Sequence, residues 1–340
     1  MPVDGNDSTE CDVDVGFVNH LYAVTYAVIL IPGLITNVLA LWVFYAYVKE
    51  TKRAVIFMIN LAVADLLQVL SLPLRIFYYL SHSWPFGQFL CMFCFYLKYV
   101  NMYASIFFLV CISVRRFLYL IYPFRFTDRR RVLDVYVSFA GWIVVCLSCL
   151  PFPLLRIGSQ NVTVPNNLCF VDLPLMDIGI ANSIITVTLA ELFGFVTPLL
   201  IVVYCSWRTI MSLREPDSLC HDLGEKKKAL KMILTCAVVF LICFAPYHIS
   251  FPLDFLAKAR KISSCSQRKA ILTFHPVALC LASLNCCLDP VIYYFTTDEF
   301  KRRLSKQEIQ DSTEMQIYCN EGFIKRECAL EVLGTNRSIL

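Results

Sequence analysis

Residues 91–117 read CMFCFYLKYVNMYASIFFLVCISVRRF, an apolar run with a cysteine at one end and an arginine pair near the other. In a helix, Cys91 and Arg116 are ~37 Å apart, enough to cross a bilayer together with part of its head groups. The run therefore predicts one membrane-spanning helix that offers a thiol to one side and two cations to the other. A protein that relays information across a membrane needs such a helix.

Six further apolar segments of similar length accompany this one. The chain is 58% hydrophobic and only 16% charged, with a mean hydropathy of +0.63, which a soluble domain of 340 residues rarely shows. The expected fold class is an all-α membrane protein, a seven-transmembrane helix bundle. We expect an outer tail over 1–20, the bundle over 21–296, and a short amphipathic helix with a cytosolic tail over 297–340. The predicted spans are 21–46, 55–80, 88–120, 134–155, 181–213, 228–257 and 268–295.

Lysine and arginine gather in alternate connections between these spans, whereas the N-terminal tail is acidic. Basic loops stay in the cytosol, so we expect a plasma-membrane protein with its N-terminus outside. The tail lacks a basic start followed by an apolar core, so the first span is expected to serve as the insertion signal. Sequons at Asn6 and Asn161 fall on the predicted outer side and are expected to be glycosylated.

The seventeen cysteines divide into two groups. Those within spans are interpreted as small apolar packing residues. They are Cys94, Cys111, Cys146, Cys149, Cys205, Cys236, Cys243, Cys280, Cys286 and Cys287. Four others, Cys11, Cys91, Cys169 and Cys265, fall on the outer side, where an oxidising compartment favours two disulfides. The positions alone leave three pairings open.

Ionisable groups within a span are costly and are usually functional. Asp65 and Asp289 lie in predicted spans, with Ser105 and Asn285 at comparable depth. Two carboxylates, a hydroxyl and an amide suit a small hard cation such as sodium. The alternative is a hydrogen-bonded polar seam in which one acid is protonated, and the sequence leaves both open.

A second polar group lies nearer the outer side. Arg75 and Tyr79 share one face of the second predicted span, and lipid cannot stabilise the arginine there. We interpret this group as the binding site of an outer anionic ligand; the alternative is separate snorkelling of basic side chains at the membrane surface. Whether Glu191 pairs with a cation of the protein or of the ligand stays open. The candidate ligand-binding residues are Arg75, Tyr79, Lys98, Tyr99, Arg156, Phe170, His248, Lys258 and His275.

Prolines within spans remove backbone hydrogen bonds and tend to kink helices. The stretch Phe240–His248 places Pro246 beside large aromatic residues, as a hinge requires. The alternative is the harmless tolerance of proline that is common in membrane helices.

Enzyme motifs are missing from the chain. There is no HExxH, no GxSxG with credible partners and no phosphate loop, and the five histidines lack metal-ligand spacing. We expect no enzyme activity, no cofactor apart from a sodium ion, and no nucleic acid partner. A transporter would show internal repeats, which this chain lacks.

These features together resemble the rhodopsin-like (class A) G-protein-coupled receptors, over about Tyr22 to Leu304. The elements, in order, are Asn37, Leu61–Asp65, Trp84, Cys91, Arg115–Arg116–Phe117, Trp142, Pro198, Cys243–Pro246 and Asp289–Tyr293. Within the family, Phe244–His248 and Asp289–Pro290 are similar to the purinoceptor-like branch. Leu70–Tyr79 and Cys94–Ser105 look like the lysophosphatidylserine receptors of that branch.

The resemblance implies pairings and roles. Cys91 would pair with Cys169, and Cys11 with Cys265. Arg116, flanked by Arg115 and Phe117, would meet a heterotrimeric G protein, with arrestin and membrane lipids as further partners. The ligand would be a lysophospholipid, foremost lysophosphatidylserine, with a nucleotide as the alternative. Its acyl chain would lie in a slot between the fourth and fifth spans, lined by Phe152, Leu154, Leu155, Phe193 and Phe195.

Two positions depart from the family pattern. Family members usually carry an acid before the key arginine, but Arg115 stands there and cannot form the restraining pair with Arg116. We therefore hypothesise raised basal signalling. A tyrosine usually lies eight residues after the fifth-span proline, where this chain has Ser206, with Tyr204 nearby.

Overall fold

The computed structural model describes residues 14–51, 55–121, 130–157, 168–170, 179–213, 220–259 and 261–296. The predicted amphipathic helix and cytosolic tail over 297–340, Cys11, and the sequons at Asn6 and Asn161 lie outside these residues. The chain divides at Thr296 into two units, and the described residues all belong to the first.

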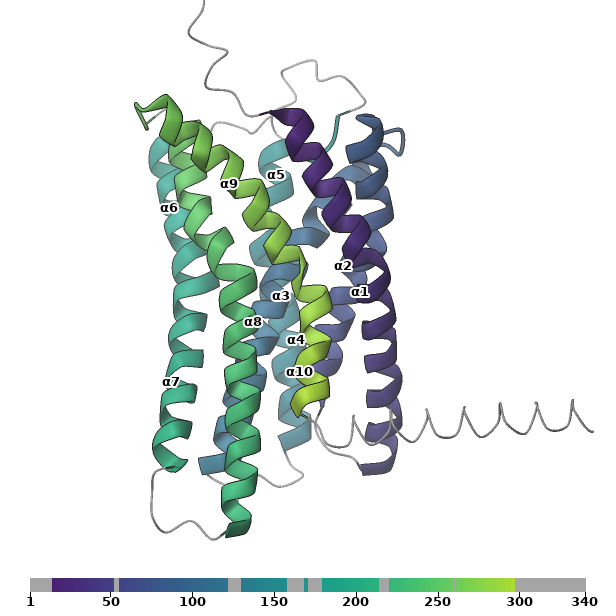
Figure 1. Ribbon diagram of the computed structural model, residues 1–340, viewed down its shortest axis with the longest axis vertical. Coiled ribbons are helices and arrows are strands. Elements are labelled where there is room, and N and C mark those ends of the chain that lie inside the picture. Colours follow the sequence, from purple (N-terminus) through teal and green to yellow (C-terminus); the bar gives the residue numbers. More distant parts are fainter. Residues whose placement is uncertain are drawn as a thin grey trace, which may run out of the picture. The chain divides into compact units, whose positions relative to one another are not determined.

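The described residues form seven long apolar helical spans and contain no strand (Figure 1), which confirms the predicted fold class. The spans run over Val15–Tyr45, Ile56–Ser81, Gln88–Leu118, Val132–Leu155, Ile180–Ser212, Ala229–Lys258 and Cys265–Pro290. Four spans are single helices: α1 (Val15–Thr51), α2 (Ile56–Ser81), α3 (Gln88–Ile121) and α8 (Cys220–Lys258).

The other three spans are interrupted. The fourth consists of α4 (Arg130–Cys149) and α5 (Pro151–Ile157). The fifth consists of α6 (Ile180–Glu191), a π-helical turn η3 (Leu192–Val196) and α7 (Thr197–Leu213). The seventh breaks at Leu284 between α9 (Cys265–Ser283) and α10 (Asn285–Thr296).

The π-helical turn has a local cause in the sequence. Pro198 has no N–H group to continue the regular hydrogen-bond ladder, and the Thr197 N–H donates to the Leu192 carbonyl, five residues back. Gly194 lies in this turn against α3, where a Cβ atom would stand only 2.6 Å from the Tyr103 ring. A glycine is therefore needed for the fifth span to approach α3 this closely.

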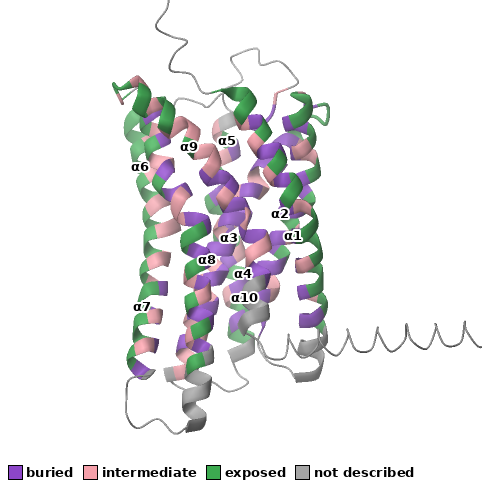
Figure 2. Ribbon diagram, in the orientation of Figure 1, coloured by how far each residue is buried: buried purple, intermediate pink, exposed green. Residues whose placement is uncertain are grey.

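The third span lies at the centre of the bundle. It packs against α2, α4, α5, α7 and α8, and Figure 2 shows buried residues concentrated along it. The first part of the fifth span is the least buried by comparison, because α6 contains no buried residue. The ten cysteines within spans are free thiols, most of them buried, which confirms their interpretation as packing residues.

Gly141 allows α4 to approach α3. A Cβ atom at this position would overlap the Phe107 ring. We expect Gly141→Ala to destabilise the bundle by about 1–3 kcal/mol, the usual cost of overpacking, and to lower thermal stability in a detergent melting assay. Ala140→Leu, on the exposed side of the same helix, is the matched control. Equal melting of Gly141→Ala and the unchanged receptor would refute this contact.

Candidate functional site

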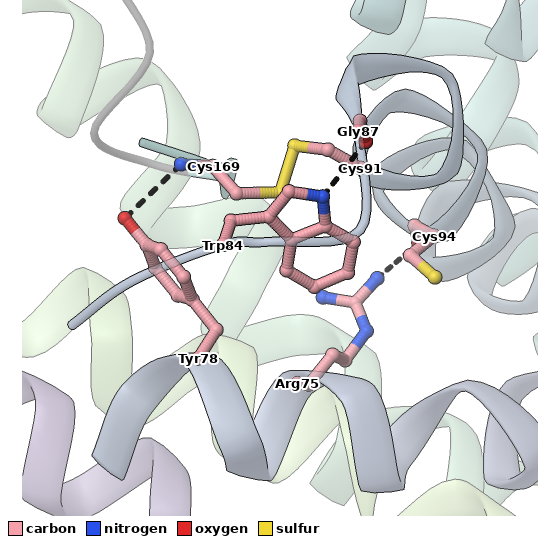
Figure 3. The surroundings of a disulfide bond; sticks show 7 residues. All are labelled: Arg75, Tyr78, Trp84, Gly87, Cys91, Cys94 and Cys169. Carbon is pink, nitrogen blue, oxygen red and sulfur yellow. Dashed lines mark hydrogen bonds between the residues drawn. A yellow bond between two sulfur atoms is a disulfide. The ribbon is translucent and has the colours of Figure 1, made fainter. Parts of the chain in front are cut away.

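A disulfide between Cys91 and Cys169 ties the start of α3 to residues 168–170 (Figure 3). The Cys169 N–H donates to the Tyr78 hydroxyl at 3.1 Å, and the Trp84 indole N–H donates to the Gly87 carbonyl at 2.8 Å. This pairing, which the family resemblance implied, is confirmed. Cys265 is also disulfide-bonded, and its expected partner, Cys11, lies outside the described residues.

Phe170, next to this disulfide, closes the end of the bundle at which α3 begins. Its backbone has a φ of +56°, which is uncommon for a residue with a side chain. Its buried ring stacks on Tyr79 at 5.9 Å between centroids and meets Tyr78 and Trp84 edge-on, each at 5.3 Å. The disulfide and these rings together hold the strained residue in place.

Arg75 lies against the Phe170 ring and is only 1% exposed. Its guanidinium donates to the Cys94 carbonyl (Figure 3) and to the Ser71 hydroxyl, the latter at 3.4 Å. The guanidinium carbon also lies 4.6 Å from the centroid of the Phe170 ring, a cation–π contact. Arg75 therefore faces the bundle interior rather than lipid.

Lys98, the second interior cation, is 8% exposed. Its ammonium donates to the Tyr26 hydroxyl at 3.4 Å and lies 5.2 Å from the centroid of the Tyr22 ring. Tyr22 stacks in turn on Tyr79 at 4.7 Å. We call Arg75, Lys98, Tyr22, Tyr26 and Tyr79 the outer cation cluster, because the sequence predicts that this end of the bundle faces outside. The sequence-based prediction missed Tyr22 and Tyr26, although their spacing of four residues places them on one face of the first span.

Glu191 pairs with a histidine of the protein. The His248 Nδ1 atom lies 3.1 and 3.2 Å from the two carboxylate oxygens, so α8 is joined to the end of α6. The imidazole also stacks on Phe195 at 4.6 Å and meets Tyr103 at 5.9 Å. The question that the sequence left open about Glu191 is thus answered by an interhelical pair within the chain.

Tyr99 joins the outer part of α3 to the fourth span. Its ring stacks on Phe152 of α5 at 4.1 Å, nearly parallel, and Phe152 also stacks on Tyr103 at 6.3 Å. The α5 helix packs against α3 and α4. Two residues of the expected acyl slot, Leu154 and Phe193, are 56% and 66% exposed, so they present apolar surface outward. Phe152 and Phe195 instead stack on aromatic rings and His248 within the bundle. Arg156 was also predicted to bind ligand, but its side chain is outside the part of the chain that the structure describes.

Lys258 and His275, also predicted to bind ligand, engage other partners. The Lys258 ammonium lies 2.7 Å from Asp254, one turn earlier in α8, and the lysine side chain is 56% exposed. The His275 Nδ1 atom lies 2.9 Å from the Ser250 hydroxyl. Neither residue belongs to the outer cation cluster.

The predicted polar seam is assembled in the core. The Asn285 amide donates to the Ser105 hydroxyl at 2.9 Å and to Asp65 at 3.4 Å. Asn101, which the sequence-based prediction missed, donates to the same Asp65 oxygen at 3.1 Å. It precedes Ser105 by four residues, so the helical period could have indicated it. Asp289 is also wholly buried.

The carboxylates of this seam keep acceptor capacity. The Oδ2 atom of Asp65 and both carboxylate oxygens of Asp289 are buried and accept no hydrogen bond among the described residues. Buried carboxylate oxygens of this kind are costly unless paired, and hard cations prefer oxygen ligands. The residues therefore fit a small monovalent cation. No cluster of three or more His, Cys, Asp or Glu side chains occurs among the described residues.

At the opposite end of α3, Arg115 has an acidic neighbour on another helix. Its guanidinium lies 3.2 Å from the Asp134 carboxylate of α4, and Asp134 is almost fully buried. Phe117 is packed inside the bundle against Cys205 and Ile233. The arginine before Arg116 is thus held toward α4, and Phe117 serves as a packing residue in this conformation.

Comparison with known proteins agrees with this architecture. Residues 36–293 match the family model "7 transmembrane receptor (rhodopsin family)". The human "Probable G-protein coupled receptor 174" is 68% identical over 87% of this chain and 88% of that protein. The human "Putative P2Y purinoceptor 10" is 50% identical over 89% of this chain and 90% of that protein. The chicken "Lysophosphatidic acid receptor 6" is 36% identical over 90% of this chain and 99% of that protein.

The matched model covers most of the chain, and the relatives align over nearly their full length. The seven spans, the Cys91–Cys169 disulfide and the buried polar seam are the structural counterpart of that match. Members of this family are multi-pass membrane receptors that signal through G proteins and are not enzymes. The chain belongs to the rhodopsin family of seven-transmembrane receptors.

Proposed function

We propose that this receptor is activated by a lysophospholipid, foremost lysophosphatidylserine, at the plasma membrane with the Cys91 end of the bundle outside. The observation that carries the proposal is the outer cation cluster. Arg75 and Lys98 are two buried cations whose described partners are a carbonyl, hydroxyls and aromatic rings. A buried cation with only neutral partners favours an anionic ligand, here the phosphate and carboxylate of the head group.

An apolar acyl chain separates this ligand class from nucleotides. Leu154 and Phe193 offer apolar surface toward the bilayer, from which a lipid would enter, and Phe152 stacks on Tyr99 between this surface and α3. A nucleotide would instead need polar partners for its base. The name of one relative, a lysophosphatidic acid receptor, agrees with the lysophospholipid proposal. The name of another, a P2Y purinoceptor, agrees with the nucleotide alternative.

The proposed activation is a shift of population. Head-group anions that draw Arg75 and Lys98 away from their present partners also disturb the Phe170 and Tyr22 rings, which lie against these two side chains. Tyr79 stacks on both rings and would be disturbed with them. If the active bundle binds the anions better, the ligand shifts the equilibrium toward it. The α8 helix, which contains Pro246 and is joined to α6 through His248 and Glu191, then pivots and opens a cleft beside Arg116 for the Gα subunit. Arrestin would use the same face.

We also propose a sodium ion as a modulator in the polar seam. Asp65, Ser105, Asn285 and Asp289 would hold it, and the ion would supply the positive charge that the unpaired carboxylate oxygens lack. Replacing sodium by choline is expected to change the basal G-protein activation of the unchanged receptor in membranes. Asp65→Asn is expected to make basal activation the same in both salts. An undiminished sodium effect in that variant would contradict the proposal.

Arg115 provides a prediction about basal activity. The residue before Arg116 is an arginine that pairs with Asp134 of α4, so this position supplies no acid to Arg116. Arg115→Asp is expected to supply such an acid and to lower ligand-independent second-messenger output about fivefold, the effect of an interaction of roughly 1 kcal/mol. Arg115→Gln, which removes the charge without adding an acid, is the matched control. Unchanged basal output in Arg115→Asp at equal surface expression would show that the hypothesis is wrong.

The ligand proposal is tested by G-protein dissociation in cells that express the receptor. Lysophosphatidylserine, lysophosphatidic acid and ATP are added separately, and cells without the receptor give the background. We expect the strongest response to lysophosphatidylserine. A response to ATP alone would assign the chain to nucleotide receptors and make the apolar wall a packing feature.

A further inference from the structure

One face of α8 forms a shallow groove at the end of the bundle that carries Arg116. The groove has a volume of about 420 Å³. Its lining residues recur at helical spacing and are Lys227, Leu230, Lys231, Leu234, Thr235 and Val238. The opposite face of the helix, with Met232, Ile233 and Cys236, is buried in the core. The groove therefore lies on the side of α8 that faces lipid.

The groove combines charge at one end with apolar surface along its length. Lys227 precedes the apolar span Ala229–Lys258 by two residues, and Lys231 follows its start by two. Both lysines are exposed, as are Leu234 and Val238. From Lys227 to Val238 the helix rises ~16 Å, about the depth of one leaflet's hydrocarbon. The ammonium groups thus lie at head-group level, and the apolar side chains continue to the bilayer centre.

We propose that this groove binds an anionic phospholipid of the cytosolic leaflet, with its phosphate on Lys227 and Lys231 and one acyl chain along Leu230, Leu234 and Val238. Charge complementarity favours this occupant, because the inner leaflet is rich in anionic lipids and the described residues that line the groove include no acidic side chain. The Thr235 hydroxyl donates to the Lys231 carbonyl, so it adds no unpaired donor to the apolar stretch.

A second copy of the receptor fits the groove less well. Identical surfaces that meet across a twofold axis would bring Lys227 and Lys231 of one protomer toward those of the other, and like charges repel. A soluble phosphate would use only the lysines and leave the apolar stretch without a role. Both alternatives are outcomes of the experiment below.

Purified full-length receptor in detergent micelles is analysed by native mass spectrometry with equal amounts of phosphatidylinositol and phosphatidylcholine. Phosphatidylinositol is the probe because its head group lacks the serine of the proposed outer ligand. We expect one saturable phosphatidylinositol adduct. Lys227→Ala with Lys231→Ala should weaken it about 25-fold, about fivefold for each lysine. Lys227→Arg with Lys231→Arg should retain it.

Arg208→Ala is the matched control, since Arg208 is an exposed cation of α7 in the same half of the bundle and does not line the groove. Equal lipid binding by the double alanine variant would overturn the proposal, as would an equal loss in Arg208→Ala. Inositol phosphate binding as tightly as the lipid, or a dimer that only the double alanine variant abolishes, would also overturn it. The ligand response of the receptor is measured separately, so a failure here leaves the proposed outer ligand untouched.

Discussion

Arg75→Ala is expected to reduce the potency of lysophosphatidylserine about 100-fold, the effect of losing charge-assisted hydrogen bonds worth about 2–3 kcal/mol. The arginine is almost fully buried, and its fork of donors now bonds to a backbone carbonyl and a hydroxyl. A desolvated guanidinium binds a phosphate far more strongly than an exposed one does. The measurement is a concentration–response curve for G-protein activation at equal surface expression.

Two variants control this result. Arg75→Lys keeps the charge but loses the planar fork, so we expect an intermediate potency. Arg268→Ala removes an arginine of α9 that lies outside the outer cation cluster, and its potency should be unchanged. Arg75→Ala with normal potency would mean that the ligand's anions bind elsewhere.

Cys169→Ser is expected to remove most receptor from the cell surface and to abolish the response of the remainder. The disulfide closes a stretch of 78 residues, and by chain entropy a loop of that length contributes about 4–5 kcal/mol to stability. The same bond holds Phe170, which covers Arg75. Surface labelling and G-protein activation in the same cells measure the two effects.

Cys146→Ser is the matched control for this prediction. Cys146 is a free, half-buried thiol in the fourth span, and its backbone carbonyl accepts a hydrogen bond from the Tyr96 hydroxyl. Its replacement should leave surface expression and potency near normal. A Cys169→Ser receptor with normal expression and potency would show that the disulfide contributes neither stability nor placement of Phe170.

The spans could be predicted from the sequence because the bilayer imposes a length and an apolar composition on each of them. The interruptions could not be placed. Pro198 and Pro246 are both prolines within spans, yet a π-helical turn precedes the first and a continuous helix contains the second. At the first, Gly194 lets the turn pack against Tyr103, a contact between helices that a proline in the sequence does not indicate.

The polar seam was predictable because a buried carboxylate or amide has few acceptable positions in a membrane helix. Asp65, Ser105 and Asn285 indeed meet. The outer residues are different, since the depth of a cation along a helix does not show which neighbour it reaches. Lys258 and Lys98 both fall in the outer half, but one bonds to an aspartate of its own helix and the other contacts tyrosines of α1.

Contacts between distant helices limited the sequence-based prediction most. The partner of Arg115 is Asp134, which is on another helix and has no sequence pattern that marks it. The pairing of Glu191 with His248 likewise depends on how α6 and α8 pack. Such pairs are set by tertiary structure, which local periodicity does not encode.

The central claim is that buried cations at the outer end recognise a lysophospholipid. Its most direct test is G-protein dissociation with lysophosphatidylserine, lysophosphatidic acid and ATP, measured side by side in the unchanged receptor and in Arg75→Ala. The account predicts a response to lysophosphatidylserine that is strongest in the unchanged receptor and largely lost in Arg75→Ala. A response to ATP alone, or a lysophosphatidylserine response that Arg75→Ala leaves intact, would contradict it.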